Sequence, residues 1–160
     1  MITQNPKKLK HILLVSTLWI LAMVWWAICI GLSSQNGEDS GELSRSFAST
    51  VTEIFNLPNT SIMSVNRCLR TLAHVVCFFV LSGLIGCACA VTFPAHTLAF
   101  MWPLIPCILF AFWDEFRKAE ILGRHCSIAE AWLNVLGCVL GCVVLGIFLW
   151  ILRRKTAKRL

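Results

Sequence analysis

The sequence predicts an all-α membrane protein whose four transmembrane helices form a single domain over residues 1–160. The composition is 58% hydrophobic and 14% charged, with a mean hydropathy of +0.76, which is typical of a membrane protein and not of a soluble domain. Four apolar runs also reach the ~20 residues that a helix needs to cross a hydrocarbon core of ~30 Å. They cover residues 12–32, 71–92, 95–113 and 131–152. Because backbone amides in lipid must be satisfied within each segment, we expect these runs to be helices.

Basic tails flank the first and last runs. Lysines lie in residues 1–11, and arginines and lysines fill residues 153–160. Since basic flanks stay in the cytoplasm, an even number of spans with both termini cytoplasmic is predicted, and residues 33–70 and 114–130 would face outside. The first run is longer than the ~7–15 residues of a signal-peptide core, so we interpret it as a retained anchor. Basic residues directly beside spans set topology, and no nucleic acid partner is expected.

An amphipathic helix is predicted between the first two spans. From Leu43, the apolar residues recur at spacings of four, four, three and one, at Phe47, Val51, Ile54 and Phe55. That periodicity places them on one face of a helix lying along the outer membrane surface until about Pro58. A lid that merely packs on the bundle is an equally good interpretation.

Polar residues share one face at the start of the second span. Arg67, Arg70, His74 and Phe78 follow one another at helical steps of three, four and four. Side chains at these spacings lie above one another on a helix. This face therefore descends from the membrane surface into the hydrocarbon.

The third and fourth spans carry residues that shape helices. Pro103 and Pro106 remove backbone donors, so we expect them to bend the third span. In the fourth span Gly137 and Gly141 would let another helix approach closely. A helix of the same chain is the expected partner, and a second membrane protein is the alternative.

Nine cysteines are present, and seven of them lie inside the predicted spans, where we interpret them as small packing residues. Cys68 and Cys126 fall near the predicted outer face, and the sequence leaves open whether they form a disulfide. His125 beside Cys126 offers two potential metal ligands without a third. We therefore expect no metal site and no cofactor.

Charged groups cluster where the second, third and fourth spans would meet at the outer face. Buried or interfacial charges cost free energy unless they pair or bind a ligand, so this cluster is the candidate site. A purely structural network of ion pairs is the alternative. The candidate ligand-binding residues are Arg70, His74, Asp114, Glu115, Arg124 and Asn134, with Gln35, Arg67, Arg117, Lys118 and Glu130 as additional members.

Three blocks of this sequence resemble the VanZ-like family of bacterial integral membrane proteins, over residues 19–144. The blocks are Leu32 to Gly37, Arg70 to His74, and Asp114-Glu115 continuing through Gly123-Arg124, Glu130, Asn134 and Gly137. The resemblance implies a multi-pass protein of the plasma membrane and cell envelope, and it raises the expectation of an effect on sensitivity to glycopeptide antibiotics. The chain departs from the family pattern at Thr71, Cys77, Phe78, Lys118, Leu122 and Glu130.

Three functions fit these residues. The first is binding of an anionic envelope component, a lipid phosphate or a cell-wall peptide carboxylate, because guanidinium groups match such oxyanions. The second is a membrane-embedded enzyme acting on an envelope lipid, with His74 as general base or nucleophile and Asp114 or Glu115 as its partner. The third is an assembly factor that packs helices against a partner protein. We favour binding of membrane lipids or a cell-wall precursor over catalysis, because no nucleophile motif or phosphate-cradling glycine loop is present.

Overall fold

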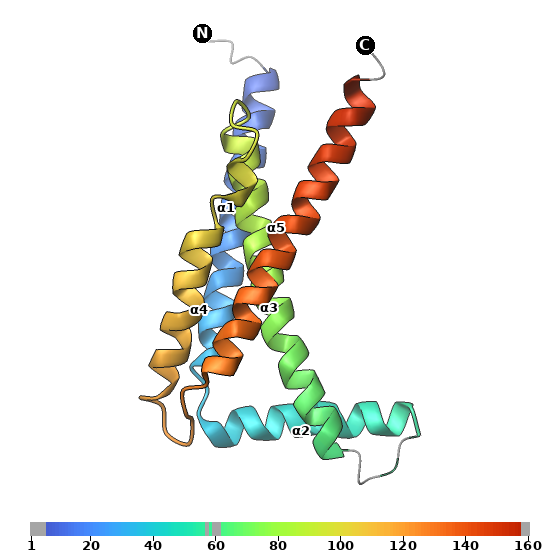
Figure 1. Cartoon of the computed structure of the whole chain (residues 1–160), viewed down its shortest axis with the longest axis vertical. Coiled ribbons are helices and arrows are strands. Elements are labelled where there is room, and N and C mark those ends of the chain that lie inside the picture. The colour runs from blue at the N-terminus through green and yellow to red at the C-terminus, as the bar shows by residue number, and fades with distance from the viewer. Residues whose placement is uncertain (1–5, 57, 59–61, 158–160) are drawn as a thin grey trace.

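The structure is a computed structural model that describes residues 6–56, 58 and 62–157. It is all-helical, and no strand occurs within these ranges, which confirms the predicted fold class (Figure 1). In chain order the elements are α1 (Pro6–Ser33), α2 (Gly37–Ile54), α3 (Ile62–Thr92), the short 3₁₀ helix η2 (Ala99–Met101), α4 (Leu104–Lys118) and α5 (Ile128–Ala157).

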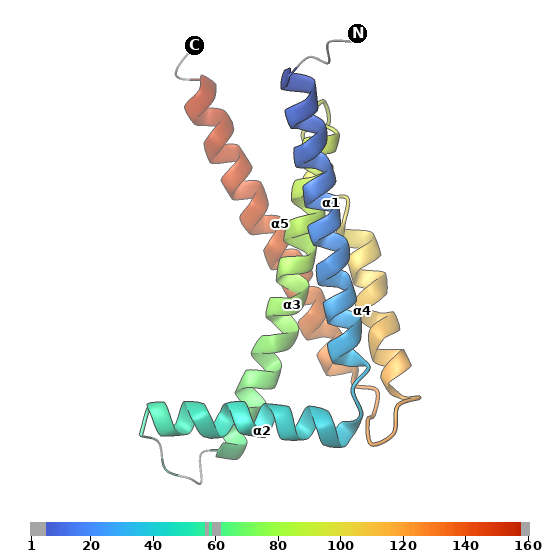
Figure 2. The same ribbon diagram turned by 180° about the vertical axis from the view of Figure 1, so that it is seen from behind.

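Four of these segments are long and apolar enough to cross a membrane, as the sequence predicted. They are α1, α3, the stretch Ala99–Lys118 that joins η2 to α4, and residues Ile128–Thr156 of α5. The chain enters and leaves the bundle at the same end, and α2 crosses the opposite end (Figure 1 and Figure 2). The helices continue beyond the apolar runs, so that α3 begins nine residues before the predicted start of its span.

The third span differs from its predicted form. The two prolines do not bend a continuous helix, because α4 begins at Leu104, with Pro103 as its N-cap residue and Pro106 in its first turn. Amides in the first turn have no acceptor within the helix, so proline costs little there. At its other end α4 continues past Trp113 to Lys118. The polar residues expected at the edge of a loop therefore lie on a regular helix.

Helices α3 and α5 cross at close range through the two predicted glycines. A Cβ atom added to Gly137 would lie 2.3 Å from the carbonyl oxygen of Val75, and one added to Gly141 would lie 2.2 Å from Ser82 Oγ. Ser82 Oγ also donates a hydrogen bond to the carbonyl of Cys138 across this crossing, at 3.0 Å. The close approach is therefore made within the chain. A partner protein binding through these glycines would have to displace α3.

Helix α2 is amphipathic, as predicted, but the fully buried side chains that the structure describes on it are small ones. Ala48 and Thr52 are buried. Phe47, Ile54 and Phe55 are 62–69% exposed in the protein. A helix that turns large apolar side chains outward at one end of a bundle suits the boundary between head groups and acyl chains.

The core contains cysteines in the packing role that the sequence suggested. Cys107 and Cys138 are buried with Phe78, Leu81 and Ala111 where α3, α4 and α5 meet. All nine cysteines lie in the described part of the chain and are free thiols, including the exposed Cys68 and the half-buried Cys126. These last two residues form no disulfide in the structure.

Candidate functional site

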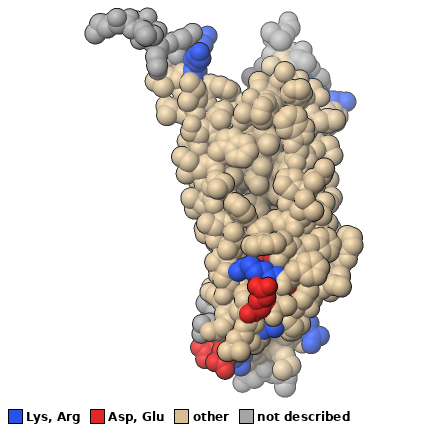
Figure 3. Space-filling view, turned by 90° about the vertical axis from the view of Figure 1, so that its left-hand side faces the viewer, with Lys and Arg blue, Asp and Glu red and all other residues tan. Residues whose placement is uncertain are grey.

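Polar side chains from α3, α4, α5 and the loop between α4 and α5 gather at the end of the bundle that α2 crosses. Figure 3 shows acidic and basic side chains near this end, next to a broad uncharged surface over the spans. Within the gathering, Asp114, Glu115, Lys118 and Asn134 are buried. The candidate residues of three separate sequence blocks therefore meet in space.

Lys118 lies at the centre of this network. Its ammonium is bonded to Glu115 and lies 3.5 Å from Glu130 Oε2 and 3.7 Å from Asp114 Oδ2. The lysine side chain is only 2% exposed. Spacings of three and four residues on α4 bring Asp114 and Glu115 beside Lys118, whereas Glu130 comes from α5. One buried cation thus joins three carboxylates and ties α4 to α5.

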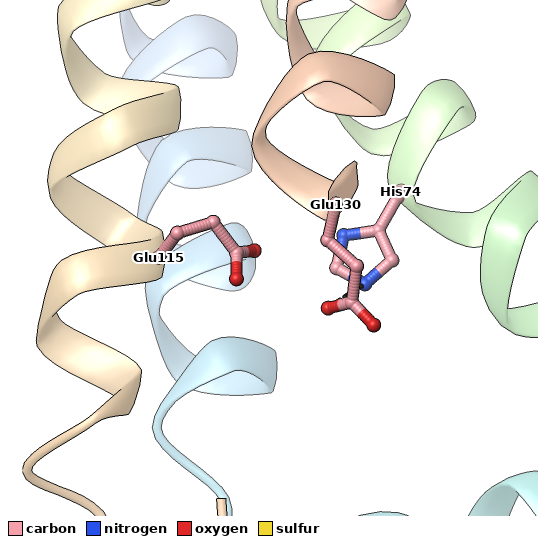
Figure 4. Close-up of side chains that lie close together, drawn as sticks. All are labelled: His74, Glu115 and Glu130. Carbon is pink, nitrogen blue, oxygen red and sulfur yellow. Dashed lines mark ion pairs between the residues drawn. The ribbon is translucent and has the colours of Figure 1, made fainter. Parts of the chain in front are cut away.

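His74 connects α3 to the first turns of α5. Its Nε2 lies 3.0 Å from Glu130 Oε2, and its Nδ1 lies 3.0 Å from Asn134 Oδ1. Which ring nitrogen donates in these contacts depends on the tautomer of His74. Figure 4 shows the His74 ring against the Glu130 carboxylate, with Glu115 pointing toward them from α4.

The hydrogen bonds of Ser127 leave the Glu130 carboxylate free to contact His74. Ser127 directly precedes α5, and its Oγ accepts a hydrogen bond from the Glu130 amide at 3.3 Å. In a capping box the glutamate would bind the serine amide in return. Here that amide donates to Glu115 Oε2 instead, at 3.4 Å. Sequence reasoning missed Ser127, although the Ser-x-x-Glu spacing of a capping box was present.

Two arginines cover the C-terminal end of α1. Arg124 Nη1 donates to the carbonyls of Ser33 and Gln35, at 3.0 and 3.3 Å. Arg117 donates to Ser34 Oγ at 2.8 Å. The last carbonyls of a helix lack intrahelical donors, and cations satisfy them well. Part of each guanidinium is thus committed to holding α1.

Two cavities adjoin at this end of the bundle. The α1–α4 cavity lies among α1, α2, α3 and α4 and has a volume of about 370 Å³. The α3–α5 cavity lies between α3 and the start of α5 and has a volume of about 270 Å³. Arg70 and His74 line both cavities.

The candidate residues divide by their place relative to these cavities. Gln35, Arg70, His74, Asp114, Lys118 and Arg124 line the α1–α4 cavity, and Arg67 and Glu130 join Arg70 and His74 on the α3–α5 cavity. Glu115, Arg117 and Asn134 line neither cavity and act through the side chains that they contact. The predicted site omitted four polar lining residues, Ser33, Ser44, Asn66 and Thr71, and two aromatic ones, Phe47 and Phe78.

Arg70 differs from the other cations of the site. It is half-buried and forms no hydrogen bond or ion pair with any residue that the structure describes. Burial and the positive charge of Arg70 both lower the pKa of Arg124, while Glu130, Glu115 and Asp114 raise it. Two neighbouring guanidinium groups therefore oppose each other, and one of them has its donors available to a ligand.

The arrangement of donors favours an internal cation over a metal ion. His74, Glu115 and Glu130 each place a ligand atom within 4.8 Å of the others, a set that could suit a transition metal. The ammonium of Lys118, however, already contacts both carboxylates. A metal ion would have to expel this buried charge, so these donors serve Lys118.

Comparison with protein families identifies the family of this chain. The VanZ/LLP1 family matches residues 18–152, a range that includes every candidate site residue. No curated protein and no solved structure matches the chain. The match covers most of the sequence, and the four apolar helices agree with the multi-pass topology that the three sequence blocks implied. This chain belongs to the VanZ/LLP1 family.

Proposed function

We propose that the chain binds an anionic component of the cell envelope, a lipid phosphate or a peptide carboxylate, through Arg70 and Arg124 in the α1–α4 cavity. The observation that carries this proposal is the half-buried Arg70, which faces two cavities without a hydrogen-bonded or ionic partner among the described residues. A guanidinium group offers two parallel N–H donors that match the oxygens of phosphate and carboxylate. An anion placed there would also relieve the repulsion between the two arginines.

The charge balance of the network supports the same location. Asp114, Glu115 and Glu130 are the three carboxylates, and Lys118, Arg117 and the His74 ring contact them. Lys118 and Arg117 offset two of these three negative charges. With Arg70 and Arg124 the cluster holds four permanent cations against three carboxylates, so a net positive charge remains, and both of these arginines line the α1–α4 cavity.

Catalysis by His74 receives less support from this geometry. A general base needs a ring nitrogen available to the substrate, whereas both nitrogens of His74 face Glu130 and Asn134 at 3.0 Å. Asp114 and Glu115, the expected partners of such a base, contact Lys118 instead. We therefore assign His74 the role of positioning α3 against α5.

The decisive variant for binding is Arg70→Ala. Arg70 forms no hydrogen bond or ion pair with a described residue, so the substitution breaks none. We expect the anionic molecule that co-purifies in mild detergent to fall at least tenfold, since a charge-assisted hydrogen bond contributes about 1.5–3 kcal/mol. Quantitative mass spectrometry of the bound molecules measures this loss. Arg153→Ala removes the same charge at the other end of the bundle and should leave the amount unchanged. Equal retention by both variants would count against an anion site at Arg70.

We also propose that the protein lies in the plasma membrane with both termini in the cytoplasm and the cluster outside, because the basic tails flank the first and last spans. The exposed thiol of Cys68 lies on the α2 side of the bundle. In intact cells it should react with a membrane-impermeant maleimide. A cysteine introduced by Thr156→Cys, with Cys68 and Cys126 changed to serine, should react only after permeabilisation. Labelling of that cysteine in intact cells would reverse the orientation.

An effect on glycopeptide sensitivity would follow indirectly from this function. The activity of such a drug would change if the component that this protein binds is also the envelope material that the drug recognises. This consequence depends on the identity of the bound anion and adds no further residue to the site.

A further inference from the structure

We propose that the occupant of the α1–α4 cavity is an amphiphile of the bilayer, with its anionic head at Arg70 and its apolar chain lying along α3 toward Phe78. This inference rests on the proposed anion site and narrows its ligand from any anion to one that carries a hydrocarbon chain. A water-soluble peptide carboxylate is the competing occupant.

Of the lining residues of α3, the charged and polar ones lie in the half of the cavity nearer α2, and only Cys77 and Phe78 lie in its deeper half. The cavity follows α3 from Leu69 to Phe78, nine residue steps that correspond to about 13 Å of helix. Arg70 and His74 lie in the half nearer α2, and Cys77 and Phe78 lie toward the middle of the bundle. The cavity therefore extends well into the depth that acyl chains occupy, because half of a hydrocarbon core is ~15 Å.

The last turns of α1 and the turn that follows it show a similar arrangement. Ser33 and Gln35 line the cavity at its α2 end, next to Leu32, and Cys29 lines it one turn deeper. Asp114 on α4 also reaches the cavity, but it is 4% exposed and its carboxylate contacts Arg117 and Lys118. The deeper wall thus offers apolar surface and no unpaired charge. A ligand with a charged group at one end and hydrocarbon at the other matches this wall.

Helix α2 connects the cavity to the lipid phase. Phe47 lines the cavity and also belongs to the exposed apolar face that includes Ile54 and Phe55. Since that face suits the membrane surface, one wall of the cavity is continuous with a surface that contacts lipid. A hydrocarbon chain would cover this wall, whereas a hydrophilic peptide would leave it against water. A volume of about 370 Å³ lies within the usual range of pockets for small ligands.

The test uses a series of phosphates of increasing chain length: inorganic phosphate, butyl phosphate, hexyl phosphate and octyl phosphate. Binding is measured to the full chain in phosphatidylcholine nanodiscs, and binding to empty nanodiscs is subtracted. If each methylene is buried, affinity should rise about fourfold per carbon. Octyl phosphate should then bind more than a hundredfold tighter than butyl phosphate. Equal affinity for inorganic and octyl phosphate would overturn the amphiphile while leaving the anion site intact.

Two variants on α3 separate chain binding from head binding. Ala73→Phe places a ring in the cavity and should reduce the increase of affinity with chain length. Val76→Phe is the control, because it adds similar bulk at an exposed position that lines neither cavity. Arg70→Ala should weaken every member of the series equally. If affinity rises with chain length as steeply in a folded Ala73→Phe protein as in wild type, the proposed place of the hydrocarbon chain is contradicted. Absence of any binding, with Arg70→Ala indistinguishable from wild type, would remove the anion site as well.

Discussion

Replacing Lys118 by methionine is expected to destabilise the protein by about 3–5 kcal/mol, the cost of leaving buried charges without their partner. Methionine keeps much of the length of the side chain but removes the ammonium that contacts Asp114, Glu115 and Glu130. Three carboxylates would then face one another in a site where Asp114 and Glu115 are almost fully buried. Unfolding in a single detergent, followed by circular dichroism, measures the loss.

Two further variants attribute this loss to the buried charge. Adding Glu115→Gln to Lys118→Met removes one of the uncompensated carboxylates and should recover part of the stability, although Glu115→Gln alone is expected to destabilise the protein. Lys155→Met removes a lysine from the last turn of α5 and should change stability by less than about 0.5 kcal/mol. Should Lys118→Met unfold at the same point as wild type, the lysine would not be the centre of the network.

The second large effect is expected from Gly137→Ala, which should cost about 2–3 kcal/mol by forcing two backbones apart. The added methyl would lie 2.3 Å from the carbonyl oxygen of Val75 and 3.1 Å from the amide of Phe79. Neither of these atoms can move without shifting α3. The same unfolding measurement applies, and the loss should be accompanied by weaker packing at the crossing of α3 and α5.

Gly83→Ala is the matched control for this substitution. It makes the same chemical change within a membrane-spanning helix, but its added methyl would meet nothing within 4 Å. Alanine there should be neutral or stabilising, by up to about 1 kcal/mol. If both alanine variants behave alike, the crossing does not depend on contact between the backbones at Gly137.

The arrangement of the spans was predictable because each span carries its own signal. Hydrophobic length identifies a transmembrane helix without knowledge of its neighbours, and the spacing of Phe47, Val51 and Ile54 identified an amphipathic helix in the same way. The prolines show the limit of such local signals. Pro103 and Pro106 predicted that the third span is not a regular helix throughout. They did not show that the chain turns before α4, so that both prolines lie at the start of a helix.

The gathering of ionisable groups at one end of the bundle was also predictable, since such groups are rare in hydrocarbon and each one indicated a location. Their individual roles depended on contacts between distant segments. Arg117 and Arg124 hold the end of α1 from more than 80 residues away, and Lys118 becomes a buried centre only when Glu130 of α5 packs against it. Ser127 is the exception, because its spacing from Glu130 was visible in the sequence.

The most direct test of the anion site is an experimental structure of the protein in a lipid bilayer, at a resolution that places the head-group atoms next to Arg70. The proposed function predicts a phosphate or carboxylate oxygen within about 3 Å of the Arg70 guanidinium, with Arg124 on the same anion and hydrocarbon toward Phe78. Arg70 paired with a carboxylate of the protein itself, beside a cavity that holds only water or uncharged lipid, would contradict it.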